Sequence, residues 1–227
     1  MKLSAETVTI LKNYAGINSN IVFRPGNVIK TMAEAKNILA SATVAEEFPS
    51  TPVGIYDLNE FLSAISMFGD PELKFSEDMN SVVIKEGKRS IRYYFSDPQI
   101  LTSPTKDIKM PEPEVVFDLS SDDLANIKKA AATLSVPDVV FRNNEGSKGI
   151  TCEVTDLTDA TSNSFTLDLD AVQMPDETPF SFVINVNNFK VLPTDYRVSI
   201  SSKLISHFEG SQSNYWLALE KTSSFGS

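Results

Sequence analysis

Apolar residues recur at three- and four-residue spacing in two segments, one at the start of the chain and one near its middle. The first, LSAETVTILKNYA, predicts a helix capped by Ser4. Its apolar face is expected to hold Val8, Leu11 and Ala15. The second, LSSDDLANIKKAA, predicts a helix capped by Ser120 or Ser121, with acidic residues in its first turn. Its apolar face is expected to hold Leu124, Ile127 and Ala131.

A second helix is predicted later in each half. The segment VGIYDLNEFLSAISMF contains an extended apolar stretch, a cap at Asp57 and then a helix. That helix is expected to bury Leu58, Phe61, Leu62 and Ile65. Aligned on the caps, residues 56–61 correspond to residues 184–189 of FSFVINVNNFKVL, which predicts a strand, a cap and a short fourth helix.

Three strands follow the second helix of each half. They are LKFSED, SVVIKEG and RSIRYYF in the first half, and YRVSISS, LISHFEG and SNYWLAL in the second, with turns at Gly87 and Gly210. The remaining segments alternate apolar and polar residues and are broken by Pro-Gly or Asn-Glu-Gly turns, which is typical of half-buried antiparallel strands. The same elements in the same order predict an α+β protein built by internal duplication, each domain an antiparallel sheet with two helices.

The segment DPQILTSPTKDIKMPEPE, residues 97–114, joins the two halves. It holds four prolines and shows no clear periodicity, so we expect an extended connector. The boundary is placed inside this connector. The predicted domains are residues 1–109, which include most of the connector, and residues 110–227.

The composition is that of a soluble globular protein, with 41% hydrophobic and 22% charged residues in 227. One cysteine, Cys152, excludes an internal disulfide framework and fits a reducing compartment. No apolar run approaches the roughly 20 residues that span a bilayer, and MKLSAETVTI has no hydrophobic leader behind its lysine. We therefore expect a cytoplasmic protein with no membrane partner.

The net charge of −10, from 20 basic and 30 acidic residues, repels nucleic acid and anionic membranes. It disfavours tight, charge-driven binding to DNA. Residues 1–109 hold 12 basic and 13 acidic residues, and residues 110–227 hold 8 and 17, so the halves carry −1 and −9. This asymmetry suits head-to-tail association of subunits, and a solvated acidic face is the other interpretation.

Catalytic chemistry has few candidate groups in this sequence. The chain offers one histidine, His207, and one thiol, Cys152, and neither has an evident partner in its motif. Nucleotide-binding glycine motifs, the H-E-x-x-H motif and calcium-loop spacing do not occur. The acidic run DLSSDD at residues 118–123 is explained by a helix cap. We predict that the protein is not an enzyme and needs no metal or cofactor.

Lysines lie away from the apolar faces of the predicted helices. Lys12 ends the first helix, Lys128 and Lys129 lie on the third, and Lys190 ends the fourth. They can be ordinary solvated positions. If the helices share one side of the sheets, however, these lysines form a weak surface for phosphates without base readout.

A different interpretation follows from RSIRYYF, residues 89–95, where basic and aromatic residues share one strand. Arg92 and Tyr94 would face one side, with Ile91, Tyr93 and Phe95 on the other. Stacking of bases on such a strand is typical of single-stranded DNA-binding modules. An amphipathic strand with one face in the core explains the same alternation, and the net negative charge opposes the alternative.

Four segments resemble the sliding clamps of T4-type bacteriophages, the processivity factors of the phage DNA polymerase. They are MKLSAETVTILKNYAGINSNIVF, VGIYDLNEFLSAIS, FSFVINVNNFK and FEGSQSNYWLALE, which are spread over most of the chain and keep the family's order and spacing. The resemblance implies a homotrimer in which three two-domain chains join head to tail. Helices would line the hole of the ring, sheets would lie outside, and edge strands of neighbouring subunits would pair.

The resemblance also implies which residues face encircled double-stranded DNA. The expected DNA-facing residues are Lys2, Lys12, Lys128, Lys129 and Lys190. Position 5 is an alanine where the family suggests another lysine, so we expect a less positive lining. A clamp held by topology needs only weak contacts, which reconciles DNA sliding with an acidic exterior.

The partners implied by the resemblance are the DNA polymerase, an ATP-dependent clamp loader and a late sigma-like transcription factor. Family partners insert short hydrophobic peptides near the connector between the domains. Ile108, Met110 and Pro111 are the predicted walls of that pocket, and packing of the connector over the domain junction is the alternative. ATP use would belong to the loader. The expected location is the cytoplasm of an infected bacterial host.

Overall fold

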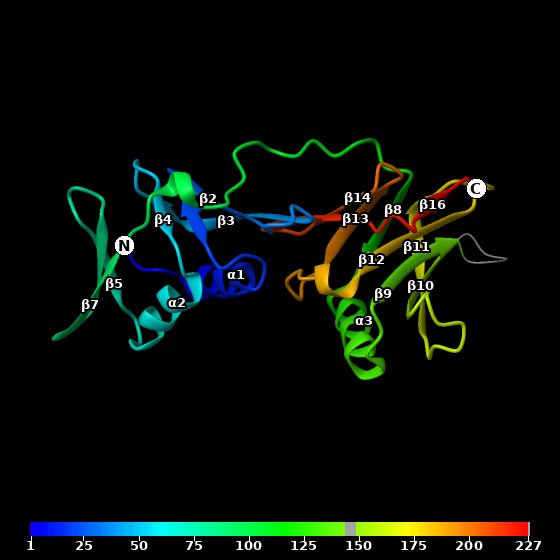
Figure 1. Ribbon diagram of the computed structural model, residues 1–227, viewed down its shortest axis with the longest axis horizontal. Helices are drawn as coiled ribbons and strands as arrows, with labels where there is room; N and C mark the ends of the chain where they lie inside the picture. Colours follow the sequence, from blue (N-terminus) through cyan, green and yellow to red (C-terminus); the bar gives the residue numbers. More distant parts are fainter. Residues whose placement is uncertain (144–148, 227) are drawn as a thin grey trace. The chain divides into compact units, whose positions relative to one another are not determined.

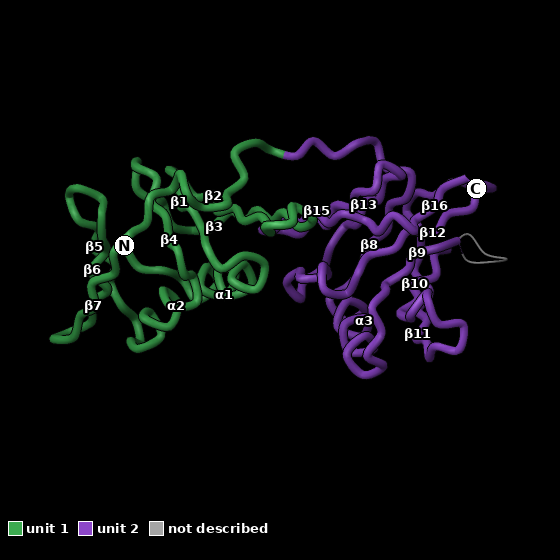
Figure 2. The backbone as a smooth tube through the Cα atoms, in the orientation of Figure 1, with its two compact units in different colours: residues 1–107 green, residues 108–227 purple. Residues whose placement is uncertain are grey.

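The computed structural model describes residues 1–143 and 149–226. The turn expected at Asn144-Glu145-Gly146 lies outside these ranges. The chain divides into two compact units, Met1–Asp107 and Ile108–Ser227 (Figure 2). Each unit combines α-helical and antiparallel β structure, and Figure 1 labels most of these elements.

Unit 1 contains two helices, seven strands and one 3-10 turn among its described residues. Their bounds are α1 Ala5–Ala15, β1 Ile21–Phe23, β2 Gly26–Met32, β3 Ile38–Phe48, β4 Val53–Ile55, α2 Leu58–Ser66, β5 Glu72–Phe75, β6 Ser81–Glu86, β7 Arg89–Tyr94 and η1 Pro98–Ile100. β1 pairs with β4, β2 with β3, and β5, β6 and β7 form an antiparallel sheet. The helices α1 and α2 pack against each other, and α1 also contacts β3 (Figure 1).

Unit 2 is built around one antiparallel sheet with the strand order β16-β12-β9-β10-β11-β8-β13-β14-β15. The bounds are β8 Val115–Leu119, α3 Ser121–Leu134, β9 Asp138–Asn143, β10 Gly149–Thr155, β11 Phe165–Gln173, β12 Phe180–Asn185, η2 Val186–Asn188, β13 Tyr196–Ser201, β14 Ile205–Glu209, β15 Ser213–Ala218 and β16 Ser224–Phe225. The helix α3 packs on β9, β10 and β11. The predicted strands and the α+β class are confirmed, and η1 and β16 are additions.

The predicted cap of α1 is confirmed, while its predicted apolar face is only partly right. Ser4 Oγ accepts a hydrogen bond from the Thr7 amide at 3.1 Å. The buried residues of α1 are Thr7, Ile10, Leu11 and Tyr14. Val8 and Ala15 are only half-buried. The larger side chains at positions 10 and 14 provide more apolar area for packing against α2 and β3, so the helix turns them inward.

The predictions for α2 and α3 are confirmed in detail. Asp57 caps α2, and the four residues predicted for its apolar face are buried. Ser120, one of the two candidates, caps α3 by accepting a hydrogen bond from the Asp123 amide. The predicted apolar face of α3 is also buried.

The predicted short fourth helix is only partly right. Asn185 does cap the segment, but only a 3-10 turn follows, at Val186–Asn188. Asparagine favours turns and caps over helix interiors, and Asn187 and Asn188 follow the cap closely. Pro193 also disfavours helical geometry at the residue before it. Unit 2 therefore has one α-helix where unit 1 has two, within the residues that the structure describes.

Candidate nucleic-acid interface

The helix faces that point away from the sheets carry mostly small and uncharged side chains. On α1 the exposed positions are Ala5, Glu6, Thr9 and Lys12. On α2 they are Asn59, Glu60, Ser63 and Ser66. On α3 they are Asp122, Ala125, Asn126, Lys129, Ala132 and Thr133. The acidic residues lie in the first turns, where the helix dipole favours them, and Lys12 and Lys129 lie further along α1 and α3.

Lys12 and Lys129 fit the prediction of a surface for phosphates best. Lys12 lies in the last turn of α1, where a cation stabilises the helix dipole. Lys129 lies on the exposed side of α3. Both side chains are exposed, and neither has a hydrogen-bond or ion-pair partner among the described residues. Their ammonium groups are therefore available to an external phosphate.

Lys2 is exposed, but its ammonium group is engaged by the carboxylate of Asp70. The hydrogen bond to Asp70 raises the pKa of Lys2 above its ordinary value, so the group stays charged. Because both partners are well exposed, this ion pair is weak and can open. Lys2 precedes α1 and does not belong to the exposed face of that helix.

Lys128 differs from its neighbour Lys129. Its side chain is half-buried and its Nζ donates to the carbonyl oxygen of Val191. The same Nζ lies 5.9 Å from the centre of the Phe189 ring. Burial lowers the pKa of Lys128. The ammonium group is thus directed into its own unit, between α3 and the segment after η2.

Lys190 is exposed and lies two residues after η2. The prediction that Lys190 ends the fourth helix is wrong, because η2 ends at Asn188. Its amide donates to the Asn188 carbonyl at 2.9 Å, so its backbone is held by the turn. Among the described residues, Lys12 on α1 and Lys129 on α3 are therefore exposed and unpaired. Lys2 pairs with Asp70, Lys128 bonds to the Val191 carbonyl, and Lys190 follows η2.

The predicted pocket residues Ile108, Met110 and Pro111 are half-buried in the connector. They do not line the cavity of about 450 Å³ that the structure places earlier in the connector. That cavity is lined by Arg24, Pro52, Asp97, Pro98, Gln99, Leu101, Ser103 and Thr105. Ile100 lies between two of these residues in the sequence and is 71% exposed. Sequence reasoning missed this cavity because it lies where η1 folds over the β1–β4 pair.

One sequence signal for this cavity was available in Gly54. A side chain at Gly54 would lie 2.6 Å from the Ser96 carbonyl oxygen and 2.7 Å from the Leu101 side chain. The amide of Ser96 donates to the Gly54 carbonyl at 2.9 Å. Close approach of two backbones requires glycine here, so a glycine inside a short apolar strand indicated that another segment crosses it.

The strand β7 has the alternation expected of RSIRYYF. Arg92 and Tyr94 are exposed, and Tyr94 is 65% exposed. Tyr93 points to the other face, where its ring meets Phe61 edge-on at 5.2 Å and its hydroxyl donates to the Asp57 carbonyl. One face of β7 therefore packs against α2, as expected for an amphipathic strand.

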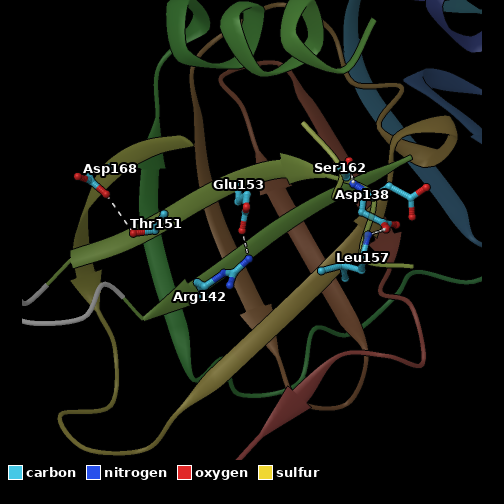
Figure 3. A network of polar contacts seen from close by, with 8 residues as sticks. Asp138, Arg142, Thr151, Glu153, Leu157, Ser162 and Asp168 are labelled. Carbon is cyan, nitrogen blue, oxygen red and sulfur yellow. Dashed lines mark hydrogen bonds and ion pairs between the residues drawn. The ribbon is translucent and has the colours of Figure 1, made fainter. Parts of the chain in front are cut away.

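The strand β11 carries Asp168, which is shown beside Thr151 of β10 in Figure 3. Asp168 accepts a hydrogen bond from Thr151 at 3.0 Å, and Arg142 forms an ion pair with Glu153 on the adjoining strands (Figure 3). Asp168 and Asp170 are exposed. β11 therefore carries two exposed acidic side chains.

The two reactive residues that the sequence offered are held in structural roles. Cys152 is fully buried, and burial raises the pKa of its thiol. His207 stacks on Trp216 with ring centres 4.6 Å apart, and its Nε2 lies 3.0 Å from Asn214 Oδ1. Burial lowers the pKa of His207. Across residues 1–143 and 149–226, no group of three or more His, Cys, Asp or Glu side chains could hold a metal ion, and no helix is long and apolar enough to cross a membrane.

Solved structures share this fold at low sequence identity. The proliferating cellular nuclear antigen of Entamoeba histolytica superposes with a TM-score of 0.71 at 14% identity, covering 96% of this chain and 97% of that chain. The A. fulgidus PCNA bound to the C-terminal region of FEN-1 gives 0.70 at 15% identity over 96% of both chains. The Helicobacter pylori beta clamp bound to a DNA ligase peptide gives 0.66 at 13% identity, covering 97% of this chain and 65% of that chain.

Sequence comparisons identify the family more specifically than these structural matches do. The family model for the C-terminal part of the gp45 sliding clamp matches residues 116–221, and that for the DNA polymerase processivity factor matches residues 4–102. The sliding clamp of Vibrio phage KVP40 is 32% identical over 223 residues, 97% of this chain and 99% of the relative. The sliding clamp of Enterobacteria phage T4 is 31% identical over 227 residues, 98% of both. The chain therefore belongs to the family of sliding clamps, the DNA polymerase processivity factors of T4-like bacteriophages.

Proposed function

We propose that this chain forms a closed homotrimeric ring that encircles double-stranded DNA and tethers the replicative DNA polymerase. The observation that carries the proposal is the character of the exposed helix faces. They carry mostly small, uncharged side chains, with acidic residues in the first turns and single free lysines further along, at Lys12 and Lys129. Such a face contacts phosphates weakly and carries no group that reads bases. Weak contact suits a ring that slides and is retained by closure.

Head-to-tail closure of the trimer is supported by two strands with unpaired edges. Within the part of the chain that the structure describes, β7 pairs only with β6. Over Phe165–Asp170, β11 pairs with β10, and its pairs with β8 are at Ala171 and Gln173. β7 carries Arg89 and Arg92, while β11 carries Asp168 and Asp170. Pairing of β7 with β11 of the next subunit would satisfy both edges and join opposite charges.

The polymerase, an ATP-dependent clamp loader and a late sigma-like transcription factor are the proposed partners. The H. pylori and A. fulgidus relatives are described with bound partner peptides. We place the partner pocket in the connector cavity beside Ile100, with Ile108, Met110 and Pro111 further along the connector. The chain itself is proposed to be non-catalytic and to act in the cytoplasm of the infected host without a cofactor.

Sedimentation equilibrium over a wide concentration range tests the assembly first. Three chains of 25.0 kDa predict a mass of about 75 kDa in the concentrated limit. The loaded ring should then remain on nicked circular DNA and slide off linear DNA. A persistent monomer that also fails to be retained on circular DNA would contradict the proposal. Saturable, salt-sensitive binding to linear single strands would favour the single-stranded DNA-binding alternative instead.

A further inference from the structure

A small apolar cavity lies in unit 2 between α3, the start of β9 and the turn η2. Its volume is about 150 Å³. The apolar walls are Ile127, Ala131, Ala132, Val139, Val186 and Phe189. An apolar cavity of about this volume holds one benzene-sized ring. It adjoins the exposed face of α3 at Ala132, and Lys129 does not line it.

The cavity follows from the shortening of the fourth helix. In unit 1, α1 packs against the nine-residue helix α2. The corresponding segment of unit 2 is a three-residue turn, Val186–Asn188. A turn of this length covers less of α3 than a helix does. The apolar side chains on that side of α3 are therefore left facing a space instead of a packed partner.

The walls of the cavity are fixed by the core around it. Ile127 and Val139 are fully buried, and Ala131 and Phe189 are 4% exposed. The Phe189 ring packs edge-on against Phe208 with centres 5.5 Å apart. Side chains held on all other sides cannot collapse into the space, so the cavity persists in the folded protein.

Lys128 also lines the cavity and gives it one charged side. Its Nζ donates to the Val191 carbonyl and lies near the face of Phe189. An ammonium group has three donor hydrogens, so two remain for another acceptor. Burial lowers the pKa of Lys128, which shows that water solvates the charge poorly there. No carboxylate pairs with this lysine among the described residues.

We propose that this cavity is a binding site for a small free carboxylate with one ring or branched apolar group, of the size of benzoate. The ring would fill the space between Ile127, Val139 and Phe189, and the carboxylate would accept hydrogen bonds from Lys128. This interaction gives the half-buried ammonium an opposite charge that the protein does not supply. A free small molecule fits better than a peptide, because the adjoining surface of α3 is small and polar and does not continue the apolar wall.

Methyl resonances of Ile127, Ala131 and Val139 can follow binding directly in the full-length protein. Benzoate, benzyl alcohol and benzylamine should be titrated separately, because they share a ring and differ in charge. We expect saturable shifts with benzoate, at an affinity about tenfold above that of benzylamine, since one ion contact is gained and one repulsion is avoided. Equal affinity for benzoate and benzylamine would overturn the assignment to Lys128.

Two alanines of α3 provide a matched pair of variants. Ala132 lines the cavity and Ala125 does not, and both are exposed, so a larger residue is tolerated at either position. Ala132→Phe should abolish the benzoate shifts, and Ala125→Phe should leave them unchanged. Lys128→Met keeps the apolar stem and should reduce the affinity for benzoate to that for benzyl alcohol. Loss of binding in both phenylalanine variants, or in neither, would contradict the site, as would the absence of saturable shifts in the unmodified protein.

Discussion

At the scale of single residues, Glu46 connects β3 to the start of α1. Its carboxylate accepts hydrogen bonds from the Ser4 amide and, at 2.5 Å, from the Thr7 hydroxyl. Partial burial would raise the pKa of Glu46, but the bonds from Thr7 and Ser4 outweigh it and hold the pKa below the ordinary value of 4.5. A carboxylate at this position also interacts favourably with the helix dipole.

Replacing Glu46 tests this arrangement. Glu46→Gln should lower the free energy of unfolding by about 1 kcal/mol at pH 7, because the hydrogen bonds lose their charge. The native pKa lies below the unfolded one, so the contribution is complete above pH 4.5 and is lost as the pH falls through the native pKa. The measurement is urea unfolding followed by circular dichroism at neutral and acidic pH.

Glu47→Gln is the control for this change. Glu47 is the next residue of β3 and is exposed. Its replacement should change the free energy by less than about 0.5 kcal/mol. A destabilisation by Glu46→Gln that stays unchanged as the pH falls over the whole range in which the protein remains folded would show that charge is not its cause.

The candidate site also shows how far residue positions can be inferred from sequence. Spacing along α3 correctly separates Leu124, Ile127 and Ala131 from the exposed face. It does not separate Lys128 from Lys129, because the difference between them depends on the Val191 carbonyl, which is distant in sequence. The connector cavity was missed for the same reason, since Gly54 and Leu101 meet only in three dimensions.

At the scale of elements, strands and helices follow from local patterns except where the backbone is poorly suited to a helix. Caps at Ser4, Asp57, Ser120 and Asn185 are all correctly inferred because side-chain oxygens near helix starts have a specific partner, the free amides. The length of the helix after a cap depends on the helix propensity of its residues and on tertiary packing. Two asparagines after Asn185 explain why η2 stays short while α2 continues.

The end of α3 offers a test of backbone strain. Ser135 closes the helix in the left-handed region, with φ of 55°. Ser135→Gly should raise the free energy of unfolding by about 0.5–1 kcal/mol, because glycine adopts this conformation without steric cost. Ser63→Gly on the exposed side of α2 is the matched change and should lower it by about 0.5 kcal/mol. Thermal unfolding shows whether each change raises or lowers the free energy of unfolding. Destabilisation by both changes would show that the backbone at Ser135 is unstrained.

The proposed pairing of β7 with β11 can be tested by exchanging charges. Arg92→Glu alone, or Asp170→Lys alone, should shift the equilibrium from trimer to monomer, and raising the salt concentration should do the same to the unmodified protein. Both changes in one chain restore opposite charges across the contact and should recover much of the trimer. Analytical ultracentrifugation measures each case. Lys203→Glu, an exposed change outside both strands, is the control, and an additive loss in the double variant would exclude the contact.

At the scale of the whole molecule, a net charge of −10 coexists with the proposed passage of DNA through the ring. Strong attraction would slow sliding, because every phosphate contact must break for the ring to advance. On the exposed helix faces, Lys12 and Lys129 offset most of the negative charge of the acidic first turns, so the proposed surface attracts phosphates only weakly. Closure of the ring, rather than affinity, would then determine how long the protein stays on DNA.

Reversing the charges of Lys12 and Lys129 tests whether these two lysines contribute to sliding on DNA. Lys12→Glu combined with Lys129→Glu should lower processive synthesis by the polymerase and shorten retention on circular DNA, while the trimer mass stays the same. Lys85→Glu with Lys203→Glu makes the same charge change at exposed positions outside the helices and should leave both unaffected. Primer extension on a circular template measures processivity. Equal effects of the two pairs would mean that total charge, and not its position, matters.

The stack of Trp216 on His207 has a spectroscopic consequence. The chain contains one tryptophan, so all of its indole emission arises from the β14–β15 hairpin. An imidazole in face contact quenches indole emission when it becomes protonated, and burial shifts that protonation of His207 to lower pH. Indole fluorescence therefore reports on this hairpin. A mild acid titration would dim the protein before any strand separates, and emission and ellipticity would follow different curves.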